Sequence, residues 1–115
     1  IVDDEPNIVM TLEYTFKKSN YEVFIARDGQ EALDILKTNF PDVIILDIMM
    51  PMVDGFATLE QIRKDANLQH TKVMFLSAKN KESDIEKGLA LGADAYMTKP
   101  FSIKKVVEKV EELLN

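Results

Sequence analysis

Residues that can bind a metal ion or a phosphate follow directly after four short apolar runs in the sequence. The apolar runs are 1–2, 43–46, 73–76 and 95–97. The residues that follow them are Asp3, Asp4 and Glu5, then Asp47, then Ser77, and finally Thr98, Lys99 and Pro100. In an open parallel α/β sheet, ligands bind at the carboxyl ends of the strands. If the runs are strands, these carboxylates, the hydroxyl and the ammonium group lie together at one edge of one sheet.

The three aspartates of this set form a cluster that requires a cation. Carboxylates held close together raise one another's pKa unless a positive charge intervenes. Asp3, Asp4 and Asp47 carry three negative charges, which a divalent ion and Lys99 would balance. Oxygen ligands without histidine or cysteine favour Mg²⁺, with Mn²⁺ as the alternative. Such a site suits an incoming phosphoryl group, with Asp47, alone at its strand end, as the nucleophile and with Asp3 and Asp4 holding the metal.

The surrounding pattern predicts the elements that must position these residues. The runs at 43–46 and 73–76 are β-branched or bulky throughout, which is typical of parallel strands covered on both faces, and a shorter run occurs at 21–25. Helices are expected from Pro6, from Asp28, after Asp54, over 81–91 with Gly92 as a left-handed cap, and from Ser102. Strand and helix alternate five times, which predicts right-handed crossovers and a three-layer α/β/α sandwich.

Composition excludes several classes of protein. With 115 residues, of which 46% are hydrophobic and 30% charged, the chain suits a single domain over 1–115 with one core. It has no cysteine and one histidine, which rules out disulfides, thiolate zinc sites and multi-histidine metal sites. The net charge of −6 argues against nucleic-acid or membrane binding, and we expect a soluble, cytoplasmic domain. A first strand of two residues is short, so we expect the first strand to be truncated at its N-terminus and the domain to belong to a longer chain.

Four motifs together resemble a two-component response regulator receiver domain of the CheY-like superfamily. They are VDDE at 2–5, LDIMMPMVDG at 46–55, LSA at 76–78 and KPF at 99–101. Each motif is weak alone, but the four occur in order at the expected strand ends. The resemblance covers the whole chain. It implies a flavodoxin-like, doubly wound fold with a five-stranded parallel sheet in the order 2-1-3-4-5.

The resemblance also implies roles for individual residues. Asp47 matches the phosphoacceptor, which takes a phosphoryl group from a histidine kinase, a phosphotransfer protein or a small acyl phosphate. Asp4 matches the direct Mg²⁺ ligand, Asp3 the ligand that acts through water, and Met49 the position whose backbone carbonyl completes the ligand set. Lys99 matches the lysine that pairs with the phosphate.

The switch residues follow from the same resemblance. Ser77 matches the switch hydroxyl, and Tyr96 matches the aromatic residue whose rotamer follows it, although an aromatic residue at a strand face is equally typical of core packing. The Lys99–Pro100 bond is expected to be cis. The surface formed by the fourth helix (81–91), the fifth strand (95–97) and the fifth helix (from 102) would then contact an output domain or target protein. Whether this surface also forms a phosphorylation-dependent homodimer is left open.

Three other functions compete with this interpretation. A Mg²⁺-dependent phosphatase with an aspartate nucleophile usually carries a second acid two residues later, where this chain has Met49, and the chain is short for a substrate cap. A flavin carrier needs a phosphate-cradling loop after the first strand, where the chain has Asp3, Asp4 and Glu5. A degenerate receiver is disfavoured because the set of residues is complete. We expect a regulatory domain rather than an enzyme, and one that loses its own phosphoryl group slowly. Met49 and Lys79 would flank the path of the hydrolytic water, and the apolar side chain of Met49 would slow this loss further.

Overall fold

Three of the apolar runs form strands of one parallel sheet. The computed structural model describes residues 1–50 and 53–115, and it places β1 (Val43–Leu46), β2 (Lys72–Ser77) and β3 (Ala95–Thr98) in the order β1-β2-β3. Both pairings are parallel. Every residue of β2 after Lys72 is buried, because helices cover both faces of the sheet. The predicted α/β fold with a parallel sheet is therefore confirmed.

The first expected strands have a different form in the structure. Val2 makes isolated parallel bridges to Leu46 on one side and to Ala26 on the other. The segments 1–2 and 21–25 are thus not regular strands, although we expected strands at both. The chain pairs here through the single residues Val2 and Ala26 rather than through a ladder of consecutive residues. The chain nevertheless runs beside β1 in the direction that the prediction requires.

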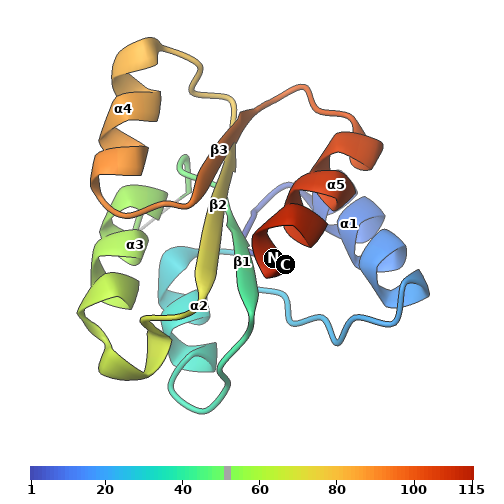
Figure 1. The fold of residues 1–115 in the computed structure, drawn as a ribbon, viewed down its shortest axis with the longest axis horizontal. Coiled ribbons are helices and arrows are strands. Elements are labelled where there is room, and N and C mark those ends of the chain that lie inside the picture. Colours follow the sequence, from blue (N-terminus) through green and yellow to red (C-terminus); the bar gives the residue numbers. More distant parts are fainter. Residues whose placement is uncertain (51–52) are drawn as a thin grey trace.

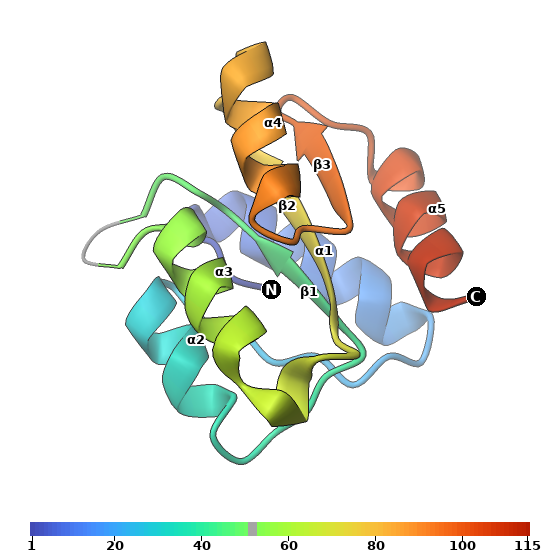
Figure 2. The same ribbon diagram turned by 60° about the vertical axis from the view of Figure 1, so that its left-hand side comes forward.

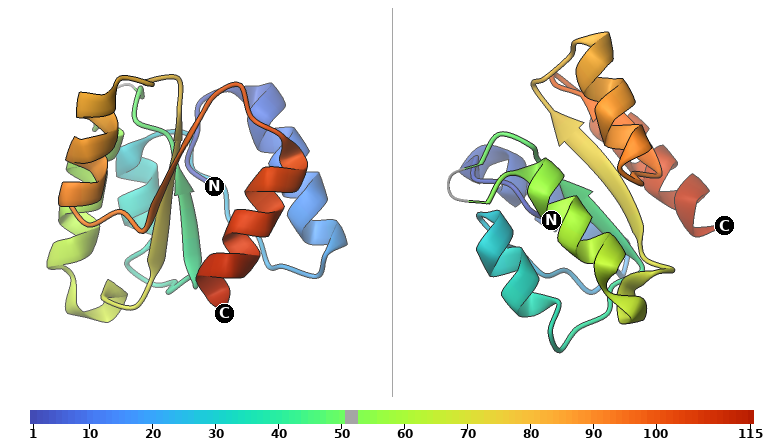
Figure 3. Two further views of the ribbon diagram at one scale, coloured as in Figure 1. Left: turned by 45° about the horizontal axis from the view of Figure 1, so that its top comes forward. Right: turned by 90° about the vertical axis from the view of Figure 1, so that its left-hand side faces the viewer.

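Helices pack on both faces of the sheet and complete three layers. Figures 1 and 3 show α2 (Gly29–Ile35), α3 (Gly55–Lys64) and α4 (Glu82–Ala90) on one side, and α1 (Pro6–Lys18) and α5 (Ile103–Leu114) on the other. A short 3₁₀ turn, η1 (Ala66–Leu68), follows α3. Figure 2 shows α4 and α5 on either side of β3. Each face has its own apolar cluster, one centred on Phe75 and Leu59, the other on Leu12, Met74 and Val106.

The helix ends follow the local signals in the sequence. The side chains of Asp28, Asp54 and Ser102 accept hydrogen bonds from backbone N–H groups in the first turns of α2, α3 and α5. Pro6 opens α1, where its missing N–H group costs nothing. Gly92 follows α4 with φ of 110°, the left-handed conformation that glycine adopts without strain. Within the described residues, no helix combines the length and apolar character needed to cross a membrane.

Candidate functional site

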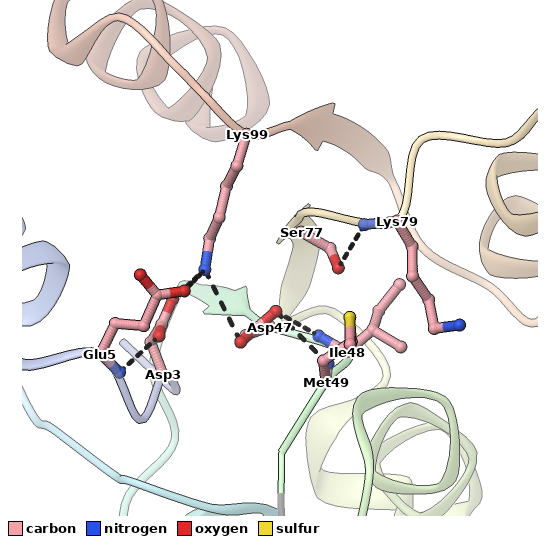
Figure 4. Close-up of polar contacts among 8 residues, drawn as sticks. All are labelled: Asp3, Glu5, Asp47, Ile48, Met49, Ser77, Lys79 and Lys99. Carbon is pink, nitrogen blue, oxygen red and sulfur yellow. Dashed lines mark hydrogen bonds and ion pairs between the residues drawn. The ribbon is translucent and has the colours of Figure 1, made fainter.

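Asp3, Asp47 and Lys99 meet at the carboxyl edge of the sheet (Figure 4). Asp3 follows the bridging residue Val2, Asp47 follows β1, and Lys99 follows β3. The Nζ atom of Lys99 lies 3.0 Å from Oδ2 of Asp3 and 3.7 Å from Oδ2 of Asp47. The side chains of both aspartates are only 4% exposed, and that of Lys99 is 11% exposed. Three segments far apart in the sequence thus build one largely buried cluster of charges.

The two carboxylate oxygens of Asp47 have different surroundings. Oδ1 accepts hydrogen bonds from the backbone N–H groups of Ile48 at 2.8 Å and Met49 at 3.4 Å. Oδ2 faces Lys99. Burial and the negative charge of Asp3 raise the pKa of Asp47, while Lys99 and the two backbone hydrogen bonds counteract part of this shift. Burial and the charge of Asp3 therefore disfavour the ionised form of Asp47, and an additional cation would stabilise that form.

The donor set at this edge fits a hard divalent ion. Asp3, Asp4 and Asp47 each offer a carboxylate oxygen, and these three atoms lie within 4.8 Å of one another. Asp3 and Asp47 are buried, whereas Asp4 is exposed, so the group opens to solvent on one side. Carboxylate oxygens in a partly open arrangement suit Mg²⁺, which retains several water molecules. The repulsion that raises the pKa of Asp47 is the repulsion that such an ion would cancel.

A fourth carboxylate, that of Glu5, also contacts Lys99. Its Oε1 atom lies 2.9 Å from Nζ of Lys99. Burial alone would lower the pKa of Lys99, but hydrogen bonds to Glu5 and Asp3 and the charge of Asp47 raise it above its usual range. Lys99 is therefore a fixed cation at neutral pH. We assigned Glu5 no role from the sequence, although its place directly after Asp3 and Asp4 was the available signal.

Ser77 and Tyr96 are linked through the backbone of the loop after β2. The Oγ atom of buried Ser77 accepts a hydrogen bond from the Lys79 N–H group at 3.2 Å. The Tyr96 hydroxyl donates to the Lys79 carbonyl at 2.7 Å. Burial, with a smaller contribution from Asp84, raises the pKa of Tyr96, so its hydroxyl stays protonated and can donate. A movement of this loop would therefore be felt by both side chains.

The remaining residues of the predicted set lie around the same edge. The backbone N–H group of Met49 donates to Oδ1 of Asp47, and the Met49 side chain is largely exposed. The Lys99–Pro100 peptide bond is cis. Gly55, at the start of α3, lies against the backbone of Asp47, and a Cβ there would be 2.6 Å from Cα of Ile48.

Part of one motif lies outside the described residues. In the segment 46–55, Pro51 and Met52 belong to the part of the chain that the structure does not describe. Asp47 and Gly55, which carry the contacts given above, both lie within the described residues.

The sequence and geometry match one known family. The response regulator receiver domain family matches residues 1–111. The chain belongs to this family. It is 44% identical over 114 residues to the alkaline phosphatase synthesis transcriptional regulatory protein PhoP of Bacillus subtilis (strain 168). That match covers 99% of this chain and 47% of the relative, so the chain spans about half the length of that protein.

Solved structures of receiver domains have the same fold. The receiver domain of the Francisella response regulator 1452 is 37% identical, with a TM-score of 0.90, and the match covers 98% of this chain and 92% of that one. The receiver domain of the sensor histidine kinase PA1611 from Pseudomonas aeruginosa PAO1 is 25% identical, with a TM-score of 0.89, and the match covers 98% and 93%. In that structure a magnesium ion is coordinated in the active-site cleft.

Membership of this family fixes the class of function. The receiver domain is the phosphoacceptor of a two-component system. It is a signalling domain rather than a catalytic one, so the expectation of a regulatory domain is confirmed and the phosphatase and flavin alternatives are not supported. The acidic cluster of this receiver domain is consistent with a magnesium site.

Proposed function

We propose that Asp47 is the phosphoacceptor of this receiver domain and that Lys99 pairs with the phosphoryl group. The observation that carries this assignment is the meeting of Asp3, Asp47 and Lys99, with Nζ of Lys99 placed 3.7 Å from Oδ2 of Asp47. An oxygen of Asp47 attacks phosphorus, and the new O–P bond forms as the P–N bond of a phosphohistidine breaks. The electron pair of the broken bond passes to the imidazole ring, which takes up a proton.

The acidic group would hold the metal that this transfer requires. The side chains of Asp3, Asp4 and Asp47, with the backbone carbonyl of Met49, are the proposed protein ligands of Mg²⁺, or of Mn²⁺ in its place. A bound Mg²⁺ neutralises negative charge on the phosphoryl oxygens and on the carboxylates. Asp47 meanwhile keeps its orientation, because Oδ1 is held by the backbone N–H groups of Ile48 and Met49.

Phosphorylation changes the charge at Asp47, and we propose that Ser77 and Tyr96 transmit this change. The site gains roughly one negative charge and new acceptor oxygens. The Ser77 hydroxyl would turn from the Lys79 N–H group to the phosphoryl group, and Tyr96 would fill the space that it leaves. The surface affected is that of α4, β3 and α5, which would contact an output domain or target protein. Comparing the sedimentation of phosphorylated and unphosphorylated protein tests whether this surface also pairs two copies.

The strand order, the extent of the domain and its place in the cell belong to the same proposal. The bridges of Val2 to Ala26 and to Leu46 support a five-stranded order in which the segment at 21–26 forms the outer edge. We propose that residues 1–115 form one receiver domain with this 2-1-3-4-5 order. We also propose that the domain works in the cytoplasm, receives its phosphoryl group from a histidine kinase or a phosphotransfer protein, and contacts neither nucleic acid nor membrane directly.

The assignment of Asp47 is tested by intact mass spectrometry after incubation with acetyl phosphate and Mg²⁺. We expect an adduct of one phosphoryl group that is stable in acid and labile in base. Asp47→Asn and an excess of EDTA should each abolish it. Asp42→Asn is the matched control, because Asp42 is exposed and lies just before β1, at the end of the strand opposite to Asp47. An adduct that persists in Asp47→Asn, or that is lost in Asp42→Asn, would contradict the assignment.

A further inference from the structure

Among the described residues, three carboxylates lie close to Lys99: those of Asp3, Asp47 and Glu5. Of these three, the roles proposed above leave only Glu5 without a function. Its Oε1 atom is closer to Nζ of Lys99, at 2.9 Å, than Oδ2 of Asp47, at 3.7 Å. The Glu5 side chain is 56% exposed, whereas those of Asp3 and Asp47 are 4% exposed. Figure 4 shows Lys99 reaching down between Glu5 and Asp3 on one side and Asp47 on the other.

The backbone around Glu5 holds this side chain within reach of Lys99. Glu5 is the residue before the first turn of α1, but its side chain makes no capping hydrogen bond to the helix. Its N–H group instead donates to Oδ1 of Asp3 at 2.9 Å, while Oδ2 of Asp3 accepts from Lys99 at 3.0 Å. Asp3 therefore connects the Glu5 backbone to the Lys99 ammonium group. The Glu5 carboxylate is used for Lys99 rather than for the helix.

The charges of the site make this contact unfavourable for a phosphoryl group. A divalent ion and Lys99 would balance Asp3, Asp4 and Asp47, but Glu5 adds a further negative charge. Phosphorylation adds roughly one more. The ammonium group has three N–H donors, and Asp3 and Glu5 already engage two of them. An incoming phosphoryl group thus competes with Glu5 for the Lys99 charge.

We propose that Glu5 is a positioning residue that holds Lys99 in the unphosphorylated state and thereby lowers the affinity of the site for a phosphoryl group. The proposal rests on the assignment of Asp47 and Lys99 given above. It extends that assignment because it names the group from which Lys99 is drawn when Asp47 is phosphorylated. Glu5 acts through Lys99 and touches neither the phosphorus nor the nucleophile.

The test measures the affinity for beryllofluoride, a mimic of the phosphoryl group on aspartate, by ¹⁹F NMR. Mg²⁺ is first titrated into each variant, and beryllofluoride is then added at a saturating Mg²⁺ concentration. We expect Glu5→Gln to bind beryllofluoride about two- to fivefold more tightly than the unsubstituted domain, the range for an exposed ion pair. Glu60→Gln removes the same charge from the exposed face of α3 and should leave the dissociation constant unchanged.

A double-mutant cycle separates an effect through Lys99 from a general effect of charge. In a Lys99→Met background, Glu5→Gln should change the affinity no more than Glu60→Gln does. Weaker or unchanged binding in Glu5→Gln would overturn the proposal, and so would an equal gain with and without Lys99. If the unsubstituted domain itself fails to bind beryllofluoride in Mg²⁺, the assignment of the phosphoacceptor site fails, and this inference fails with it.

Discussion

Replacing Lys99 with methionine removes the charge of the ammonium group from the site while keeping most of its apolar stem. At an effective dielectric constant of about 20, Coulomb's law gives about 5.5 kcal/mol for the contact of Lys99 with Asp3 at 3.0 Å and about 4.5 kcal/mol for that with Asp47 at 3.7 Å. The desolvation of the ammonium group offsets part of this attraction. Removing one partner of a buried pair costs about 3–5 kcal/mol, and we expect Lys99→Met to lower the free energy of unfolding by that amount in metal-free protein.

Magnesium should restore much of this loss. A ligand at one hundred times its dissociation constant stabilises the folded state by about 2.7 kcal/mol. The Lys99→Met site is more negative by one charge, so it should bind Mg²⁺ more tightly than the unsubstituted site and gain more stability from it. The difference between the two proteins should therefore narrow when EDTA is replaced by Mg²⁺.

The assay is urea unfolding followed by far-ultraviolet circular dichroism, in EDTA and in Mg²⁺. Lys17→Met is the matched control, because Lys17 contacts Glu13 at the same 3.0 Å but on the exposed side of α1. An exposed pair contributes little, so we expect a change of about 0.5 kcal/mol or less for this variant. Equal losses for the two variants in EDTA, or a gap that Mg²⁺ leaves unchanged, would refute the reasoning.

Three further predictions follow from the same geometry. Because burial and Asp3 raise the pKa of Asp47, ionisation of this residue destabilises the metal-free fold, so the stability gained in Asp47→Asn should be absent below the unfolded pKa of 3.8 and should grow as the pH rises above it. Urea titrations at several pH values in EDTA measure this gain, and a gain that is the same at every pH would contradict the prediction. Met49→Asn should speed the loss of phosphate, because a polar side chain there can orient the hydrolytic water; decay of the phosphorylated mass peak measures this, and unchanged or slower decay counts against it. Gly55→Ala should lower the free energy of unfolding by about 1–3 kcal/mol in urea, because its Cβ would press on the backbone of Asp47 and Ile48, and a stability equal to that of the unsubstituted domain would show that α3 can move away.

Local patterns predicted most of the elements. The runs at 43–46 and 73–76 are apolar on both faces, and this pattern is sufficient to indicate covered parallel strands. The caps at Asp28, Asp54 and Ser102 depend on contacts within three residues, so they are visible in the sequence. The prediction of a strand at 21–25 was wrong: the chain makes one isolated bridge there, between Ala26 and Val2, because strand formation depends on cross-strand neighbours as well as on the residues of the strand itself.

The sequence by itself determined which residues stand at the strand ends, since each follows its apolar run directly, and it therefore brought Asp3, Asp47, Ser77 and Lys99 to one edge. Only the tertiary structure decided how these groups pair. Lys99 and Glu5 are 94 residues apart in the chain, and their contact depends on the order of the strands and on the path of the loop into α1. The two oxygens of Asp47 likewise differ only because one meets backbone N–H groups and the other meets an ammonium group. Spacing along a chain gives the edge on which a side chain lies, whereas its rotamer and its partner are set by the charges that folding places around it.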